Sequence, residues 1–205
     1  AAEETQADAW LGQNGVGTTS NPLETQAFAS GSPDPVMLAV AAYGGQVGII
    51  NSGNLELAGL TSGNDAKIGT TGTLTLGNSI SVPGNLDLRA NNGMVIDQTV
   101  AAGGDLFLTS GAGDMGIFGV SVSGTNVELA GRSIFVGSTE GTAPTSVMAS
   151  HLVKATTSLN FNVIGGANSS ATSLVLGENV DLTVGGVVNI SGGSAYGQSE
   201  SSLAP

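Results

Sequence analysis

The sequence predicts an all-β protein built as a right-handed parallel β-helix, a solenoid of about 20 residues per turn. Three observations lead to this prediction. Similar phrases open at Gly84, Gly104 and Gly124, which are 20 residues apart. Apolar residues recur in pairs separated by one residue, which places both on one face of a short strand. Residues that favour turns (Gly, Asn, Asp, Ser and Pro) fill the gaps between the pairs.

Composition limits the classes of partner. The chain has 205 residues, 33 of them glycine, no cysteine and a formal net charge of -12. It has only 4 Lys and Arg against 16 Asp and Glu, too few cations to neutralise a phosphate backbone or an anionic lipid surface. We therefore predict no nucleic-acid partner and no direct membrane insertion. The absence of cysteine leaves the redox compartment open.

Residues 1–43 are predicted to form an extended arm and an N-terminal cap. Residues 1–35 show no sustained period of 2 or 3.6 and contain three prolines, which favours an extended arm with one helical turn around Glu3 to Trp10. A disordered leader is the alternative. Trp10 favours an arm that docks, because a tryptophan buries a large area in a groove. The apolar run from Val36 to Tyr43 is expected to cap the first turn of the array.

Residues 44–191 carry the repeat. Three successive apolar pairs begin at Leu74, Ile80 and Leu86, six residues apart. A sandwich of hairpins needs longer strands, whereas three strands of about three to five residues and their corners add up to about 20 residues. We therefore expect one short strand on each of three faces. The pairs are Leu55/Leu57, Leu74/Leu76, Ile80/Val82, Leu86/Leu88, Met94/Ile96, Leu106/Leu108, Val120/Val122, Val127/Leu129, Ile134/Val136, Leu174/Leu176, Val180/Leu182/Val184 and Val188/Ile190.

The rhythm is interrupted once and then fades. Gly137 to His151 is rich in Ser, Thr, Gly and Pro and is predicted to be a loop that projects from one corner. The strands resume less regularly over residues 152–191, where Ile190 is expected to be buried. Residues 192–205 return to Ser, Gly and Gln, which predicts a flexible or docking tail.

Two phrases of the repeat resemble a known family. Ala102 to Leu108 (AGGDLFL) and Gly124 to Gly131 (GTNVELAG) are similar to the repeats of filamentous-haemagglutinin-type exoproteins, the large secreted partners of two-partner secretion systems. The resemblance covers residues 53–191. It implies a β-helical repeat region that is extracellular or on the outer cell surface of a Gram-negative-type bacterium. The chain lacks the Asn-Pro-Asn-Gly and Asn-Pro-Asn-Leu motifs of that family's secretion domain, so an interior or carboxy-terminal piece is implied.

Outward-facing aromatic residues are the candidate interaction residues. If Leu106 and Leu108 face the core, Phe107 faces outward, and the same parity places Phe118 and Phe135 outward. Exposed apolar groups on a soluble protein often mark contact sites. Our hypothesis is that these three phenylalanines, together with Trp10, contact another segment or another subunit. The alternative is that residues 1–35 or the Gly137 loop of the same chain covers them.

Catalytic and metal-binding patterns are weak. Asp87, Arg89 and Asp97 are the nearest approach to the acidic and basic cluster of a β-helical polysaccharide lyase or hydrolase, but a solvated ion pair is the favoured interpretation. His151 is the only histidine, so no Ser-His-Asp order can be argued. Gly111 to Asp114 resembles a calcium-binding nonapeptide, which works only in tandem and occurs here once. We predict no enzyme activity, no cofactor and no metal.

The sequence therefore predicts a structural or interaction module of a secreted bacterial surface protein. It is expected to act either as a stiff adhesin segment or as a subunit of a surface fibre, sheath or larger complex. Its predicted partners are other protein subunits, including further copies of itself, or a receptor on a host or neighbouring cell. The alternative from another class is a β-helical polysaccharide lyase or hydrolase.

Overall fold

The structure is a computed structural model, and it describes residues 7–10, 23–26, 35–137, 144–165 and 173–191. About 70% of these residues lie in β-strands and none lies in a helix, which confirms the all-β prediction. Accordingly, the described ranges contain no helix long and apolar enough to cross a membrane. The strands form parallel sheets, one of them strongly curled, an arrangement compatible with a β-helix or solenoid.

One sheet has nine strands within the described residues. Its order is β1-β3-β5-β7-β10-β13-β15-β17-β20, so strands that follow one another in the sheet are separated along the chain by strands of the other sheet. The strands are β1 (Ala7–Trp10), β3 (Val36–Ala42), β5 (Leu55–Ser62), β7 (Thr73–Leu76), β10 (Gly93–Ile96), β13 (Met115–Phe118), β15 (Ile134–Gly137), β17 (Phe161–Ile164) and β20 (Val188–Ser191).

The second sheet has eleven strands in the same described ranges. Its main path is β18-β16-β14-β12-β9-β6-β4-β2; beside this path, β8 pairs with β11, β11 pairs with β14, and β19 pairs with β16. The strands are β2 (Leu23–Gln26), β4 (Val47–Ser52), β6 (Ala66–Thr70), β8 (Ile80–Val82), β9 (Leu86–Ala90), β11 (Val100–Ala102), β12 (Leu106–Ser110), β14 (Ser121–Gly131), β16 (Thr145–Thr157), β18 (Ser173–Leu176) and β19 (Asn179–Val184).

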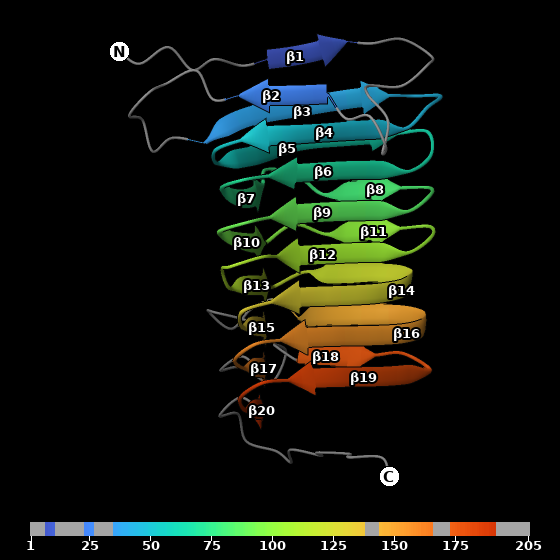
Figure 1. Cartoon of the computed structure of the whole chain (residues 1–205). Coiled ribbons are helices and arrows are strands. Elements are labelled where there is room, and N and C mark those ends of the chain that lie inside the picture. The colour runs from blue at the N-terminus through green and yellow to red at the C-terminus, as the bar shows by residue number, and fades with distance from the viewer. Residues whose placement is uncertain (1–6, 11–22, 27–34, 138–143, 166–172, 192–205) are drawn as a thin grey trace.

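Parallel register aligns equivalent residues along the stack of strands. Leu86 pairs with Leu106, and Leu106 pairs with Val127. A longer column starts at Leu23 and ends at Leu182, through Ile49, Ile68, Leu88, Leu108, Leu129 and Ala155. Figure 1 shows this stacking, with β1 at one end and β20 at the other.

The core lies between the sheets and follows the predicted alternation in β9 and β12, but the predicted inward pair Leu174/Leu176 is wrong, because both residues are exposed and pair with the outward Ser146 and Met148. In β9 the side chains of Leu86 and Leu88 are fully buried, whereas Asp87 and Arg89 point outward. Successive residues of a strand face opposite sides, so each strand contributes one apolar row to the interior. Burial of aliphatic side chains stabilises the fold by roughly 25 cal/mol for each Å² removed from water.

Two strands are much longer than the predicted three to five residues. β14 has 11 residues and β16 has 13. The first part of β14 pairs with β11 and its second part with β12, and its pairing with β16 shifts register between Gly124 and Asn126. A bulge of this kind bends a strand without ending it. Two predicted faces of the coil are therefore joined into one curled sheet where β14 and β16 run.

The predicted loop from Gly137 to His151 is wrong over its second half. β16 begins at Thr145, and His151 is exposed in the middle of that strand. The hydroxyl of Thr145 donates to the carbonyl of Gly137 at 2.8 Å and fixes the start of the strand. The sequence did not predict this strand because Ser, Thr and His are frequent on its outer side and at its bend.

The N-terminal predictions also need correction. Residues Ala7–Trp10 form strand β1, so no helical turn exists there. The expected cap at Val36 to Tyr43 is instead an interior strand, β3, which pairs with β1 on one edge and β5 on the other. Other parts of the predicted arm, loop and tail (1–6, 11–22, 27–34, 138–143, 166–172 and 192–205) lie outside the described residues.

Candidate interaction surfaces

Phe107 faces outward as predicted, on the eleven-stranded sheet. It lies half-buried in β12 between two register partners, Asp87 of β9 and Glu128 of β14. The same outward row continues to Lys67 on one side and to Lys154 on the other. Phe107 is therefore the aromatic member of a charged row and not the centre of an apolar patch.

Phe118 and Phe135 lie on the other sheet, so the structure does not bring the three phenylalanines together. Both are half-buried, in β13 and β15. The Phe118 ring covers Gly116, since a Cβ built on that glycine would lie 2.2 Å from Cε2 of the ring. Gly116 pairs with Phe135 on one side and with Val95 on the other. Together, these residues form a small apolar cluster on the outer face of the nine-stranded sheet.

Trp10 ends strand β1, opposite Ala41 of β3. It therefore belongs to the first strand in the order of the nine-stranded sheet. Phe118 and Phe135 lie in β13 and β15, far from β1 in that order, and Phe107 lies in the other sheet.

The residues of the alternative lyase or hydrolase do not form one site. Arg89 Nε donates to both carboxylate oxygens of Asp87, at 2.8 and 3.0 Å, on the outer side of β9. This hydrogen bond raises the pKa of the Arg89 guanidinium. Asp97 is exposed beyond the end of β10, and no contact among the described residues joins it to Arg89. Arg89 and Asp87 form an ion pair on the outer side of the sheet, and in the part of the chain that the structure describes no contact joins it to a second acid.

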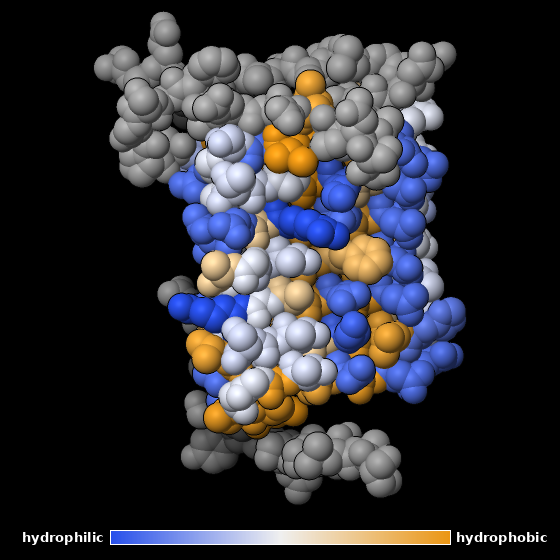
Figure 2. All heavy atoms as spheres, in the orientation of Figure 1, coloured by the Kyte–Doolittle hydropathy of each residue, from blue (hydrophilic) through white to orange (hydrophobic). Residues whose placement is uncertain are grey.

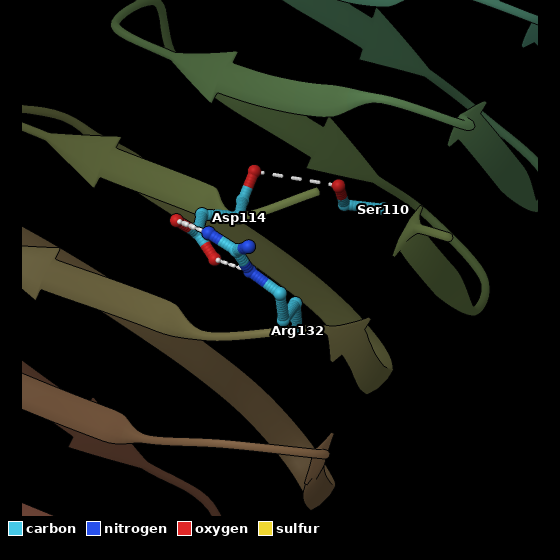
Figure 3. Close-up of polar contacts among 3 residues, drawn as sticks. All are labelled: Ser110, Asp114 and Arg132. Carbon is cyan, nitrogen blue, oxygen red and sulfur yellow. Dashed lines mark hydrogen bonds and ion pairs between the residues drawn. The ribbon is translucent and has the colours of Figure 1, made fainter. Parts of the chain in front are cut away.

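The sequence that resembles a calcium motif ends in a second ion pair. Arg132 Nε and Nη2 donate to the two oxygens of Asp114, each at 2.9 Å, across neighbouring turns of chain (Figure 3). Ser110 completes the corner, because its hydroxyl donates to the backbone oxygen of Asp114 at 3.3 Å. The hydrogen bond and charge of Arg132 lower the pKa of the Asp114 carboxyl. Asp114 therefore holds adjacent corners together.

This ion pair predicts a pH effect. Because the pKa of Asp114 is lowered by folding, its contribution is present above the ordinary carboxyl pKa and is lost as the pH falls through the lowered value. We expect Arg132→Gln to lower the melting temperature slightly at neutral pH and to leave it unchanged in strong acid. Thermal unfolding of both proteins across this pH range tests it; a difference that persists in acid would contradict the prediction.

A ladder of Asp and Asn side chains runs along one corner. Asp65 Oδ1 accepts the backbone N–H of Asn85 at 2.8 Å, and Asn85 Oδ1 accepts that of Asp105 at 2.8 Å. Asp105 Oδ1 in turn accepts the side-chain amide of Asn126 at 2.8 Å. Each step joins one turn of chain to the next. Sequence reasoning missed this ladder, although an Asp or Asn precedes the apolar pair in each of these phrases.

The ladder explains two of the glycines that define the repeat. A Cβ on Gly84 would lie 2.4 Å from Asp65 Oδ1, and a Cβ on Gly104 would lie 2.4 Å from Asn85 Oδ1. These distances are too short for non-bonded atoms. Glycine precedes the donor residue because the side-chain oxygen from the previous turn occupies the space of a Cβ.

Substitution of the ladder should weaken the stack. We expect Asn85→Ala to cost about 1 kcal/mol, because the N–H of Asp105 loses its acceptor at a partly solvated corner. Asn91→Ala is the matched control, since among the described residues the Asn91 side chain donates to that of neighbouring Asn92 and not across to another turn. Denaturant unfolding measures both. Equal losses for the two variants would show that the ladder contributes nothing of its own.

Strands β18, β19 and β20 carry several exposed apolar residues. No residue from 173 to 191 is buried, and Ile190, which we expected to be buried, is 61% exposed. Figure 2 shows hydrophobic residues gathered around these strands. Large exposed apolar patches mark contact sites in soluble proteins. The large exposed apolar residues here are Met148, Ile164, Leu174, Leu176, Val180, Val187, Val188 and Ile190.

Metal-binding geometry is absent from the described ranges, which contain no group of three or more His, Cys, Asp or Glu side chains that could hold an ion. Compared with known proteins, the chain matches no family model, no curated protein and no solved structure.

Proposed function

We propose that this chain is a structural and interaction module of a secreted bacterial surface protein, and that it folds as a right-handed parallel β-helix of about 20 residues per turn. Its task is mechanical: it acts as a stiff segment that contacts other protein subunits. The observation that carries this proposal is the unbroken column of paired residues from Leu23 to Leu182.

Register offsets support the proposed turn. Pairs such as Leu74 with Met94 and Leu86 with Leu106 are 20 residues apart. Later pairs are more widely spaced, as for Phe161 with Val188, which are 27 apart. A parallel crossover between strands of one sheet is nearly always right-handed, which supports the proposed hand.

The ion pairs on the outer surface support a binding or structural role. The cations Arg89, Arg132 and Lys154 each lie in an ion pair with a carboxylate. Lys67 lies opposite Asp87 in the register. The secreted surface location rests on the sequence resemblance alone.

Two measurements test the proposal. Small-angle X-ray scattering should give an elongated particle of constant cross-section, because each turn adds length and not width. Antibodies raised against the chain should label intact, unpermeabilised cells of its source organism. A compact particle would contradict the stiff-segment proposal, and labelling that requires permeabilised cells would contradict the surface location.

A further inference from the structure

The corner between β9 and β10 holds the dipeptide Asn92-Gly93. Of all the residues that can follow an asparagine, glycine leaves the asparagine amide most open to attack, because it has no Cβ to obstruct its own backbone nitrogen. The Asn92 side chain is exposed, and its Oδ1 accepts a hydrogen bond from Asn91 Nδ2 at 3.2 Å. That bond draws electrons from the carbonyl carbon of the amide and makes this carbon more electrophilic. An activated amide thus lies beside an unobstructed nucleophile.

This corner also lacks a side-chain bond from the core that the two neighbouring corners have. Thr70, Ala90 and Ser110 are register partners at the ends of β6, β9 and β12, and all three are buried. The hydroxyl of Thr70 accepts the backbone N–H of Gly72 at 3.4 Å. The hydroxyl of Ser110 donates to the backbone oxygen of Asp114 at 3.3 Å. Ala90 has no polar group with which to bind its own corner, so less must be broken for the Asn-Gly pair to rearrange.

We propose that Asn92 is a site of spontaneous deamidation. The backbone nitrogen of Gly93 attacks Cγ of Asn92, and the new N–Cγ bond closes a cyclic imide. Nδ2 leaves as ammonia and carries away the proton of the attacking nitrogen. One water molecule then opens the imide at either of its two carbonyl carbons.

The two ways of opening the imide give two products. Cleavage of the new N–Cγ bond gives aspartate, whereas cleavage of the original peptide bond gives isoaspartate, in which the chain runs through Cγ. In total the reaction consumes one water and releases one ammonia, with no oxidant or cofactor. This modification concerns the chemical lifetime of the chain and goes beyond the proposed function.

Isoaspartate is the product that alters the stack, because it lengthens the backbone in a tightly fitted corner. The N–H of Asn92 donates to the backbone oxygen of Gly72, on the preceding turn, at 3.0 Å. On the following turn, a Cβ added to Gly113 would lie 1.9 Å from the backbone oxygen of Asn92, so these two corners have no spare room between them. A chain that runs through Cγ displaces both contacts. Aspartate keeps the normal backbone and adds a carboxylate at an exposed position.

Peptide mapping of the folded chain tests the site. Trypsin cleaves after Arg89 and Arg132, so Asn92 is recovered in the peptide 90–132, where fragmentation in the mass spectrometer locates the change. We expect storage to convert Asn92 to a mixture of aspartate and isoaspartate, with release of ammonia. The rate should rise with pH, because the attacking nitrogen must lose its proton. A chain that keeps this amide while folded and loses it only in denaturant would overturn the proposal.

Asn78 is the control inside the same molecule. It is also exposed, but Ser79 follows it, and its Nδ2 donates to the backbone oxygen of Ala58 on the preceding turn. Trypsin recovers it in the peptide 68–89, separately from Asn92. Asn78 should therefore keep its amide over the time in which Asn92 loses it. Equal conversion at the two positions would contradict the claim that the β9–β10 corner selects the site.

Two substitutions separate the reaction from its effect on stability. Asn92→Gln should stop ammonia release from peptide 90–132, because the longer side chain would have to close a larger ring. Asn92→Asp carries the charge of the product on a normal backbone. Denaturant unfolding of the stored chain should show a population with a lowered midpoint that stored Asn92→Gln and fresh Asn92→Asp lack. If the stored, deamidated chain unfolds at the same midpoint as fresh Asn92→Asp, isoaspartate does not disturb the corner and that part of the proposal is wrong.

Discussion

Leu108→Ala should cost about 3 kcal/mol of stability, whereas Phe107→Ala, one residue away, should cost about 1 kcal/mol or less. Leu108 is fully buried between Leu88 and Leu129 of the adjacent strands, so its truncation leaves a cavity inside a continuous column. Phe107 is the larger side chain, but it is half-buried in the charged outer row. The smaller residue is therefore expected to have the larger effect.

Guanidinium unfolding followed by circular dichroism measures both losses as shifts of the midpoint at constant slope. The two positions control for one another, because they share a strand and face opposite sides of the sheet. If Phe107→Ala costs as much as Leu108→Ala, the outer side of β12 is packed against another segment or subunit, as the original hypothesis for Phe107 proposed.

Gly113→Ala should be the most damaging of the conservative glycine substitutions. A Cβ at this buried position would lie 1.9 Å from the backbone oxygen of Asn92 and 2.2 Å from its carbonyl carbon. The obstacle is backbone of the neighbouring turn, which cannot rotate away as a flexible side chain does. We expect a loss of roughly 3 kcal/mol, at the upper end of the cost of overpacking.

Gly69→Ala is the matched comparison. A Cβ there would meet the Cγ1 of Ile50 at 3.8 Å and the backbone oxygen of Ile49 at 3.9 Å, both ordinary contact distances. We expect a change within about 0.5 kcal/mol, because alanine meets no close neighbour here and restricts the unfolded chain. Thermal and denaturant unfolding of both variants checks the contrast. A comparable loss at the two positions would mean that backbone freedom, and not the space between turns, sets the requirement for glycine.

The parity of short strands could be predicted from the sequence because it depends only on local alternation. The pairs Leu86/Leu88 and Leu106/Leu108 predicted buried sides, and the structure confirms both. Strand length depends instead on whether the next turn keeps the same register, and no local pattern reports that. The long β16 was missed for this reason, as its bend near His151 resembles a loop.

The candidate interaction surfaces could likewise be predicted only in part. Outward placement of Phe107, Phe118 and Phe135 follows from alternation, but their separation onto two sheets depends on which strand lies on which face. Exposure of Ile190 could not be predicted from alternation, since that pattern marks it as inward. Its exposure depends on what lies beyond β20, which is a property of the stack and not of the strand.

The low burial of strands β18 to β20 also affects how the protein opens. Strands β9, β12 and β14 pair with other strands on both edges, whereas β20 pairs, among the described strands, with β17 and contains no buried residue. Backbone amides exchange with solvent hydrogen through local opening, whose free energy is smallest where few apolar contacts must be broken. Among these strands, backbone amides should therefore exchange fastest in β18–β20 and slowest in β9–β14, so that local unfolding of the chain begins at β18–β20.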